Sequence, residues 1–249
     1  MKDLFKAIRS YCEANADPAR ATRYERYFVE GYDAYGLDHK APSWQASIEQ
    51  WAAELRKGDV QDLIRLGGKL VRTGKYEEAS FAILLGVELK EWHTAELFDG
   101  IATWFDGGIR NWAHTDILCG ELLPGLLLNH AAPLDRLVAW VESPHKYQRR
   151  AVPVTMIKLL KHYPHKDLLP AVEPLMTDPE KVVHQGAGWF LRELWKLSPA
   201  LVEEFLQRHK EHAPRLIVQY ATEKMTPAQK QKFRRTPGAA RRPVKEKKG

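Results

Sequence analysis

The chain has few cysteines and no long apolar run, and both absences narrow the class of protein. Of its 249 residues two are cysteine, Cys12 and Cys119, and they lie far apart in the sequence. This count and spacing argue against a disulfide framework and against a cysteine-ligated zinc site. No run of 18 apolar residues occurs, and the N-terminus has an acid close to its start and no apolar core. We therefore expect a cytoplasmic protein that is not secreted and has no membrane span.

The sequence also lacks the short motifs that identify several enzyme classes. Its ten histidines form no H-E-x-x-H or comparable ligand spacing, so we predict no metal site. A glycine-rich phosphate loop, a G-x-S-x-G elbow and a Cys–His arrangement suited to nucleophilic catalysis are all missing. These absences exclude nucleotide hydrolysis and acyl transfer, and we expect no cofactor.

The net charge of +6 suggests a nucleic-acid partner until its distribution is considered. Residues 228–249 hold nine of the 38 Lys and Arg side chains and one of the 32 acids. This segment therefore carries +8, which leaves −2 on residues 1–227. We predict a helical domain over 1–227 followed by a basic, disordered tail over 228–249. Any anion-binding surface on the domain must then be a local arrangement of Arg and Lys.

Apolar residues recur three and four positions apart along the chain, and the alternation typical of strands is missing. The loops are short, and helix pairs repeat about every 35–40 residues, as in HEAT-type repeats. We predict an all-α, HEAT-like helical repeat solenoid with a concave face, on which we expect the functional site; an irregular helical bundle is the alternative. The predicted helices span residues 2–15, 19–35, 43–57, 59–73, 75–89, 91–105, 112–129, 133–140, 146–163, 166–176, 179–196, 200–212, 214–223 and 227–233.

An acid follows an aromatic residue by four positions at the start of the helix predicted over 112–129. Residues four apart share a helix face, with about 5–6 Å between Cβ atoms, so Trp112 and Asp116 would stand side by side. A carboxylate beside an indole suits a cation. The alternative is structural, because an Asp near a helix start is commonly a cap and a helical Trp commonly packs in the core. His114, between the two, has no evident role.

Two further helices contain unusual residues. Arg149 and Arg150 stand at the start of an apolar helix, where the macrodipole disfavours a cation, so they suggest an anionic partner. Gly186 and Gly188 precede Trp189 in mid-helix, although each Gly costs about 1 kcal/mol relative to Ala. Such small residues let either a neighbouring helix or a ligand approach, and helix packing is the more common reason.

Aromatic residues alternate with Arg in residues 23–28, which include Tyr27. Aromatic rings interleaved with Arg can stack on nucleic-acid groups. An aromatic stripe at helical spacing is more often part of a core. Trp44 and Trp51, seven positions apart, are best interpreted as packing residues.

Taken together, these stretches resemble the DNA alkylation repair glycosylases of the AlkD family over residues 23–205. Trp112 and Asp116 resemble the family's Trp and catalytic Asp, and Arg149 resembles its phosphate-facing Arg. The helix that contains Trp189 resembles the one that carries the family's second active-site Trp, and Tyr27 resembles the N-terminal Tyr. The resemblance depends on the order and spacing of these motifs.

The resemblance implies a monomeric DNA glycosylase that acts on double-stranded DNA in base excision repair, in the nucleoid. It would excise 7-methylguanine and 3-methyladenine by hydrolysing the N-glycosidic bond, without the base pocket that most glycosylases use. An N-alkylated base is cationic and leaves without a general acid, so a carboxylate would stabilise the oxocarbenium-like sugar and orient water. Three catalytic residues and three DNA contacts are implied: Asp116, Trp112, Trp189, Arg149, Arg150 and Tyr27.

Two other classes of function remain open. One is a non-catalytic HEAT-like protein that binds DNA structures, and the other is a protein-interaction scaffold. Relatives of this fold that lack the Asp bind DNA without cleaving it, so Asp116 favours the enzyme. The family usually has a basic residue at position 186 and aromatics at 182 and 183, where this chain has Gly186, Val182 and Val183. We expect these substitutions to weaken or relocate DNA contacts.

Overall fold

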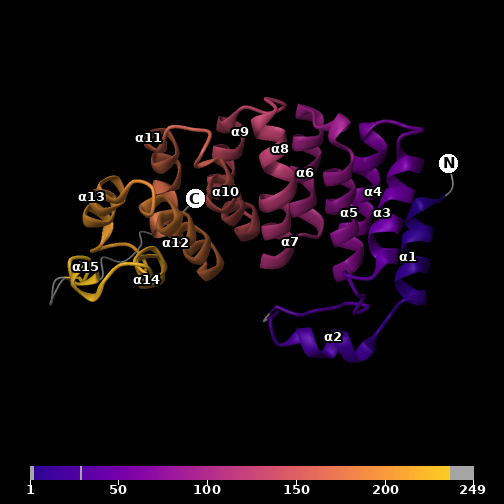
Figure 1. Ribbon diagram of the computed structural model, residues 1–249, viewed down its shortest axis with the longest axis horizontal. Helices are drawn as coiled ribbons and strands as arrows, with labels where there is room; N and C mark the ends of the chain where they lie inside the picture. Colours follow the sequence, from indigo (N-terminus) through magenta and orange to yellow (C-terminus); the bar gives the residue numbers. More distant parts are fainter. Residues whose placement is uncertain (1–2, 29, 236–249) are drawn as a thin grey trace, which may run out of the picture. The chain divides into compact units, whose positions relative to one another are not determined.

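The computed structural model describes residues 3–28 and 30–235, which are mainly helical (Figure 1). The connections are short except for the one between α2 (Pro18–Glu25) and α3 (Pro42–Leu55), which spans residues 26–41. The all-α helical-repeat fold predicted from the periodicity is confirmed. Within the described residues, the backbones of Asp33 and Lys75 pair in an isolated β-bridge. No helix among the described residues is long and apolar enough to cross a membrane. The chain divides into two compact units, which meet between Trp140 and Val141.

Unit 1 is a row of packed helices. Helix α5 lies at its centre, in contact with α3, α4 and α7, and α4 also packs on α6. The Phe81 ring is fully buried against Trp44, at 4.2 Å between ring centroids, and Trp51, at 5.0 Å, which confirms the packing interpretation of both tryptophans. The helices are α1 (Leu4–Ala14), α2 (Pro18–Glu25), α3 (Pro42–Leu55), α4 (Val60–Arg72), α5 (Tyr76–Glu88), η1 (Lys90–Trp92), α6 (Ala95–Gly107), α7 (Trp112–Ile117), η2 (Leu118–Leu122), α8 (Leu123–Leu128) and α9 (Leu134–Val138).

Unit 2 is centred on α12, which packs between α10 and α14. A Cβ atom at Gly186 would lie 3.2 Å from Cγ of Arg150 on α10, and one at Gly188 would lie 2.5 Å from Cβ of Tyr220 on α14. Both glycines therefore serve close helix packing rather than a ligand. After η3 (Ala139–Glu142), which spans the boundary, the helices are α10 (Lys146–Leu159), α11 (His165–Leu168), η4 (Leu169–Thr177), α12 (Lys181–Trp195), α13 (Pro199–His209), α14 (Arg215–Ala221) and α15 (Pro227–Gln231).

The helix predicted over 19–35 is shorter than expected, because α2 ends at Glu25. The backbone then turns at Gly31 and Gly36, whose φ angles of +105° and +79° lie in the left-handed region that favours glycine. In Figure 1, α2 and the segment after it lie apart from the row α3 to α8. This segment forms one wall of the candidate site.

The helix predicted over 112–129 is continuous but changes its winding. Helix α7 passes into the π-helical turn η2 and then into α8. Pro124 lies in the first turn of α8 and has no N–H to donate to the carbonyl four residues earlier, so regular α-helical bonding is interrupted there. π-Helical turns of this kind are frequent at functional sites.

The tail predicted to be disordered from Ala228 is ordered at its start. Helix α15 is capped by reciprocal hydrogen bonds between Thr226 and Gln229, and Phe233 is buried. Nη2 of Arg235 donates to the carbonyl oxygen of Ala213 at 2.7 Å. The disorder prediction is therefore wrong for residues 228–235, because an apolar anchor and a helix cap attach them to unit 2. The rest of the predicted tail, 236–249, lies outside the described residues.

Candidate functional site

The first residue of α7 is exposed although it is a tryptophan. Asn111 caps the helix by accepting from the backbone N–H of His114 at 2.9 Å. Trp112 is 41% exposed, and its indole Nε1 donates to the carbonyl oxygen of Tyr27 at 3.1 Å. The Phe28 ring stacks on the indole at 5.7 Å between centroids. Two of the expected site residues, Tyr27 and Trp112, are thus brought together although 85 positions separate them.

Asp116 follows one turn after Trp112 on the same helix. It is half-buried and lies two residues before the start of the π-helical turn η2 at Leu118. The cap of α7 is Asn111 and not Asp116, so the capping role considered for this acid does not apply. A half-buried carboxylate one turn from an exposed indole is the arrangement that the spacing predicted.

A cavity of about 720 Å³ opens beside Trp112 within unit 1. Seven aromatic side chains line it, and Tyr24, Tyr27 and Trp112 are its exposed rim. Its floor is buried and includes Trp44 and Glu77. The family resemblance implied no base pocket, so this cavity is a feature that sequence reasoning missed. It went unnoticed because its lining comes from α2, α3, α5, α7, η2 and the segment after α2.

The wall of the cavity is held by a buried acid on α5. Glu77 accepts hydrogen bonds from three consecutive backbone N–H groups, those of Tyr35 at 2.8 Å, Gly36 at 2.7 Å and Leu37 at 3.1 Å. A carboxylate that receives three N–H bonds satisfies backbone donors which would otherwise be buried without partners. The signal in the sequence was an acidic pair at the start of an apolar helix, and sequence analysis did not use it.

The neighbouring acid, Glu78, is fully buried and fixes the same wall to α1. Its carboxylate accepts from Arg9 at 2.9 Å and 3.2 Å, and from the hydroxyl of Tyr35 at 2.9 Å. Burial by itself raises the pKa of Glu78, but hydrogen bonds from Arg9, Thr73 and Tyr35 outweigh it and hold the pKa below its ordinary value. The acid is therefore ionised and paired at neutral pH.

His114 is explained by its position under α7. The ring is buried and stacks on Tyr76 at 4.6 Å between centroids. Its Nδ1 pairs with the amide nitrogen of Asn111 at 2.9 Å, and its Nε2 pairs with the carbonyl oxygen of Tyr76 at 2.9 Å. Since Asn111 donates and the carbonyl accepts, the ring is neutral with its proton on Nε2. Burial lowers the pKa of His114 from 6.5 to about 4, which keeps it neutral.

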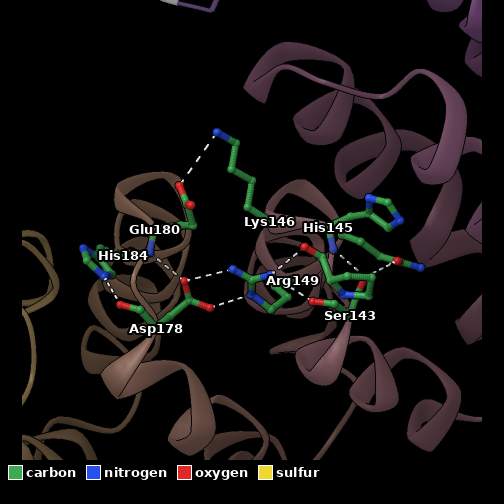
Figure 2. Close-up of polar contacts among 9 residues, drawn as sticks. Ser143, His145, Lys146, Arg149, Asp178, Glu180 and His184 are labelled. Atoms are coloured by element: carbon green, nitrogen blue, oxygen red, sulfur yellow. Dashed lines mark hydrogen bonds and ion pairs between the residues drawn. The ribbon is translucent and has the colours of Figure 1, made fainter. Parts of the chain in front are cut away.

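Arg149 in unit 2 is turned inward (Figure 2). Its guanidinium forms two bonds to the Asp178 carboxylate, at 2.6 Å and 3.3 Å, and donates to the carbonyl oxygens of Ser143 at 2.8 Å and Pro144 at 3.2 Å. The two side chains are 13% and 5% exposed. The phosphate contact expected of Arg149 does not fit this geometry, because the donors serve the loops before α10 and α12.

Arg150 and Trp189 occupy different environments in the same unit. Arg150 is 5% exposed and donates to the carbonyl oxygen of Val182 at 2.7 Å, so the expected phosphate contact does not fit a side chain buried between α10 and α12. Val183 and Gly186 are buried too, and neither position presents a surface to DNA. Trp189 is half-buried on α12.

The sequence matches the family model described as DNA alkylation repair enzyme over residues 8–225. The chain therefore belongs to the DNA alkylation repair enzyme family. No curated protein matches it.

Three solved structures share its fold. A predicted DNA alkylation repair enzyme from Enterococcus faecalis superposes with a TM-score of 0.73 at 18% identity, over 86% of this chain and 98% of that one. AlkD2 from Streptococcus mutans gives 0.56 at 18% identity, over 83% and 97%. Smu.31 from Streptococcus mutans UA159 gives 0.54 at 19% identity, over 72% and 92%. At these identities the likeness shows the fold alone.

Proposed function

We propose that this protein is a monofunctional DNA glycosylase that excises cationic alkylated purines, among them 7-methylguanine and 3-methyladenine, in base excision repair. The observation that carries the proposal is α7, which presents an exposed Trp112 and places Asp116 one turn behind it. Membership of the DNA alkylation repair enzyme family supports the substrate class. The protein would act as a monomer on double-stranded DNA in the nucleoid, without a cofactor.

The proposed reaction is hydrolysis of the bond between the purine nitrogen and C1′ of the sugar. Alkylation gives the purine a positive charge, so the bond breaks with its electron pair moving to the ring, and the base leaves neutral. Positive charge develops on the sugar as the bond breaks. Asp116 would stabilise that charge and orient the water whose oxygen bonds to C1′ and whose proton passes to solvent.

The aromatic groups would hold the lesion nucleotide. The exposed part of Trp112 would make a cation–π contact of about 0.5–2 kcal/mol. Trp189 in unit 2 is the second aromatic residue that the family resemblance assigns to this role. Tyr27 would contact DNA beside Trp112, whose indole it already orients through its backbone carbonyl. We assign Arg149 and Arg150 to the internal structure of unit 2 and leave phosphate contacts to other residues.

The test is release of free base from alkylated DNA. Chromatography of the supernatant should show 7-methylguanine or 3-methyladenine after incubation with the full chain in EDTA, because a carboxylate mechanism needs no metal. Loss of release on chelation would exclude this mechanism. DNA binding without release would favour the non-catalytic DNA-structure binder, and absence of salt-sensitive DNA binding would favour the protein scaffold.

A further inference from the structure

The first two residues of α5 contact the elements on both sides of the exposed Trp112. The ring of Tyr76 stacks on His114 in α7, and the Tyr76 carbonyl oxygen accepts from Nε2 of the same histidine at 2.9 Å. The carboxylate of Glu77 accepts from the backbone N–H groups of residues 35–37 in the α2–α3 connection. The start of α5 therefore holds α7 next to the α2–α3 connection.

The α2–α3 connection reaches the indole through two consecutive residues. The carbonyl oxygen of Tyr27 accepts from Nε1 of Trp112 at 3.1 Å, and the Phe28 ring stacks on the indole with 15° between the two planes. Phe28 is fixed in turn, because Tyr32 stacks on its ring at 4.4 Å between centroids and Tyr76 packs edge-on at 5.5 Å. These contacts set the direction in which the 41% exposed indole faces.

Glu77 is the buried support of this arrangement, and it is 3% exposed. One carboxylate oxygen accepts from the N–H groups of Gly36 at 2.7 Å and Leu37 at 3.1 Å, and the other accepts from that of Tyr35 at 2.8 Å. Consecutive N–H groups that converge in this way form a concave backbone site for an anion. A glutamine there would turn an NH₂ group toward at least one N–H donor, so the connection would lose part of its attachment.

We propose that Glu77 is a positioning residue for base release, because it holds the α2–α3 connection in the position that orients Trp112 beside Asp116. The proposal rests on the proposed glycosylase function, in which Trp112 contacts the lesion nucleotide. Glu77 itself does not touch the substrate, since it is buried and both of its carboxylate oxygens accept from backbone donors. The competing role is purely structural: Glu77 would then support the fold of unit 1 without affecting Trp112 in particular.

The first measurement is exchange of the Trp112 indole hydrogen with water, followed by NMR in the full chain labelled with ¹⁵N-tryptophan. The Trp112 signal is the one that disappears in Trp112→Phe. Glu77→Gln should speed its exchange about 10-fold, because the hydrogen bond to the Tyr27 carbonyl opens more often. The Trp104 indole, which donates to the carbonyl oxygen of Ile64 at 3.3 Å, should exchange as in the wild type. Unchanged exchange at Trp112 would overturn the proposal.

Two further variants separate this effect from a loss of folding. Glu77→Asp keeps the charge but shortens the side chain by one methylene, so it should also speed exchange at Trp112, and it carries the test if Glu77→Gln does not fold. Glu88→Gln is the matched control, because it removes a carboxylate from the opposite end of α5, where the neighbour is Arg56 at 4.0 Å. It should leave both the exchange and base release unchanged. Equal acceleration at Trp104 and Trp112 in Glu77→Asp would show a purely structural role and overturn the proposal.

The second measurement is a double-mutant cycle on kcat/KM for base release from alkylated DNA. Glu77→Gln should lower kcat/KM about 10-fold in the otherwise wild-type chain, because misplacement of a group that contacts the substrate slows the reaction. In a chain that already carries Trp112→Ala the same substitution should cost about 2-fold or less, since Glu77 acts through the indole. Equal losses in the two backgrounds would overturn the proposal. If the wild type releases no base, the glycosylase function fails by itself, because hydrogen exchange tests the link between Glu77 and Trp112 without turnover.

Discussion

At the scale of single residues, α7 carries two titratable side chains, one with a charged and one with a neutral role. In the proposed mechanism the Asp116 carboxylate stabilises a developing cation, whereas His114 is buried and must stay neutral to bridge Asn111 and the Tyr76 carbonyl. The exposed Trp112 stands on the same turn. The roles of these residues can be separated by substitutions that retain shape and remove charge.

Asp116→Asn retains the size of the side chain and most of its hydrogen-bonding capacity. We expect base release to fall about 10²–10³-fold, because preorganised stabilisation of developing charge is lost. Affinity for undamaged DNA and the unfolding temperature should stay near those of the wild type. Single-turnover kinetics would measure the loss, with Asp135→Asn, on the exposed side of α9, as the control. Near-normal release would make Asp116 a structural residue.

His114 gives the fold a specific pH dependence. Its pKa is about 4 in the folded protein against 6.5 for an ordinary histidine, so the unfolded chain takes up a proton first as pH falls. The stability it contributes is complete above pH 6.5 and is lost between pH 6.5 and 4, by up to about 3 kcal/mol. Denaturant unfolding at several pH values should show that the free energy of unfolding falls less steeply with decreasing pH in His114→Gln than in the wild type. Identical slopes in the two proteins would contradict the assigned neutral state.

At the scale of elements, unit 2 depends on a polar clamp between the start of α10 and the loop before α12. Arg149 reaches from α10 to Asp178, and Asp178 in turn accepts from the backbone N–H of Glu180 at 2.8 Å (Figure 2). The Asp178 carboxylate also offsets the unfavourable interaction between the Arg149 cation and the helix macrodipole at the start of α10. Two loops and two helices thus share one ion pair.

Arg149→Ala should destabilise unit 2 by about 3–5 kcal/mol, because it leaves the buried Asp178 carboxylate without its partner. Lys146→Ala is the matched control on the same helix. Its 3.7 Å contact with Glu180 joins side chains that are 31% and 42% exposed, and such a pair contributes about 1 kcal/mol or less. Urea unfolding compares the two. Similar small losses in both variants would show that the clamp is not structural, and would return Arg149 to consideration as a phosphate contact.

At the scale of the whole molecule, the charge and the fold belong to different parts of the chain. The C-terminal 22 residues carry +8, while the helical body that supplies the candidate site carries −2. Part of that basic segment, through Phe233 and Arg235, is packed on unit 2. Truncations can therefore separate the electrostatic contribution of this segment to DNA binding from its contribution to the stability of unit 2.

A chain that ends at Arg235 loses five of the nine C-terminal cations and Glu246. We expect lower nonspecific DNA affinity and a flatter dependence on salt, because fewer counterions are released. Its unfolding temperature should match that of the full chain. A chain that ends at Thr226 also loses Phe233 and should be about 2–3 kcal/mol less stable. Salt titrations and thermal unfolding of both truncations give the comparison, and an unchanged salt slope would show that residues 236–249 do not contact DNA.

The sequence by itself determined the features that depend on neighbours a few positions apart. Apolar spacing predicted the all-α fold, and the four-residue interval between Trp112 and Asp116 predicted their shared turn of α7. Short-range backbone geometry decides such relations, so they hold whatever the chain packs against. The winding of η2 was also implicit in Pro124, although sequence analysis did not use it.

Only the tertiary structure decided which way the polar and aromatic side chains face. Arg149 and Arg150 are adjacent basic residues in the sequence, yet Asp178 and the Val182 carbonyl draw both inward. Tyr27 meets Trp112 because Glu77 anchors the segment after α2, and the aromatic cavity exists because of that contact. The physical reason is common to these cases: each hydrogen bond depends on a partner from a distant element, and local periodicity contains no information about that partner.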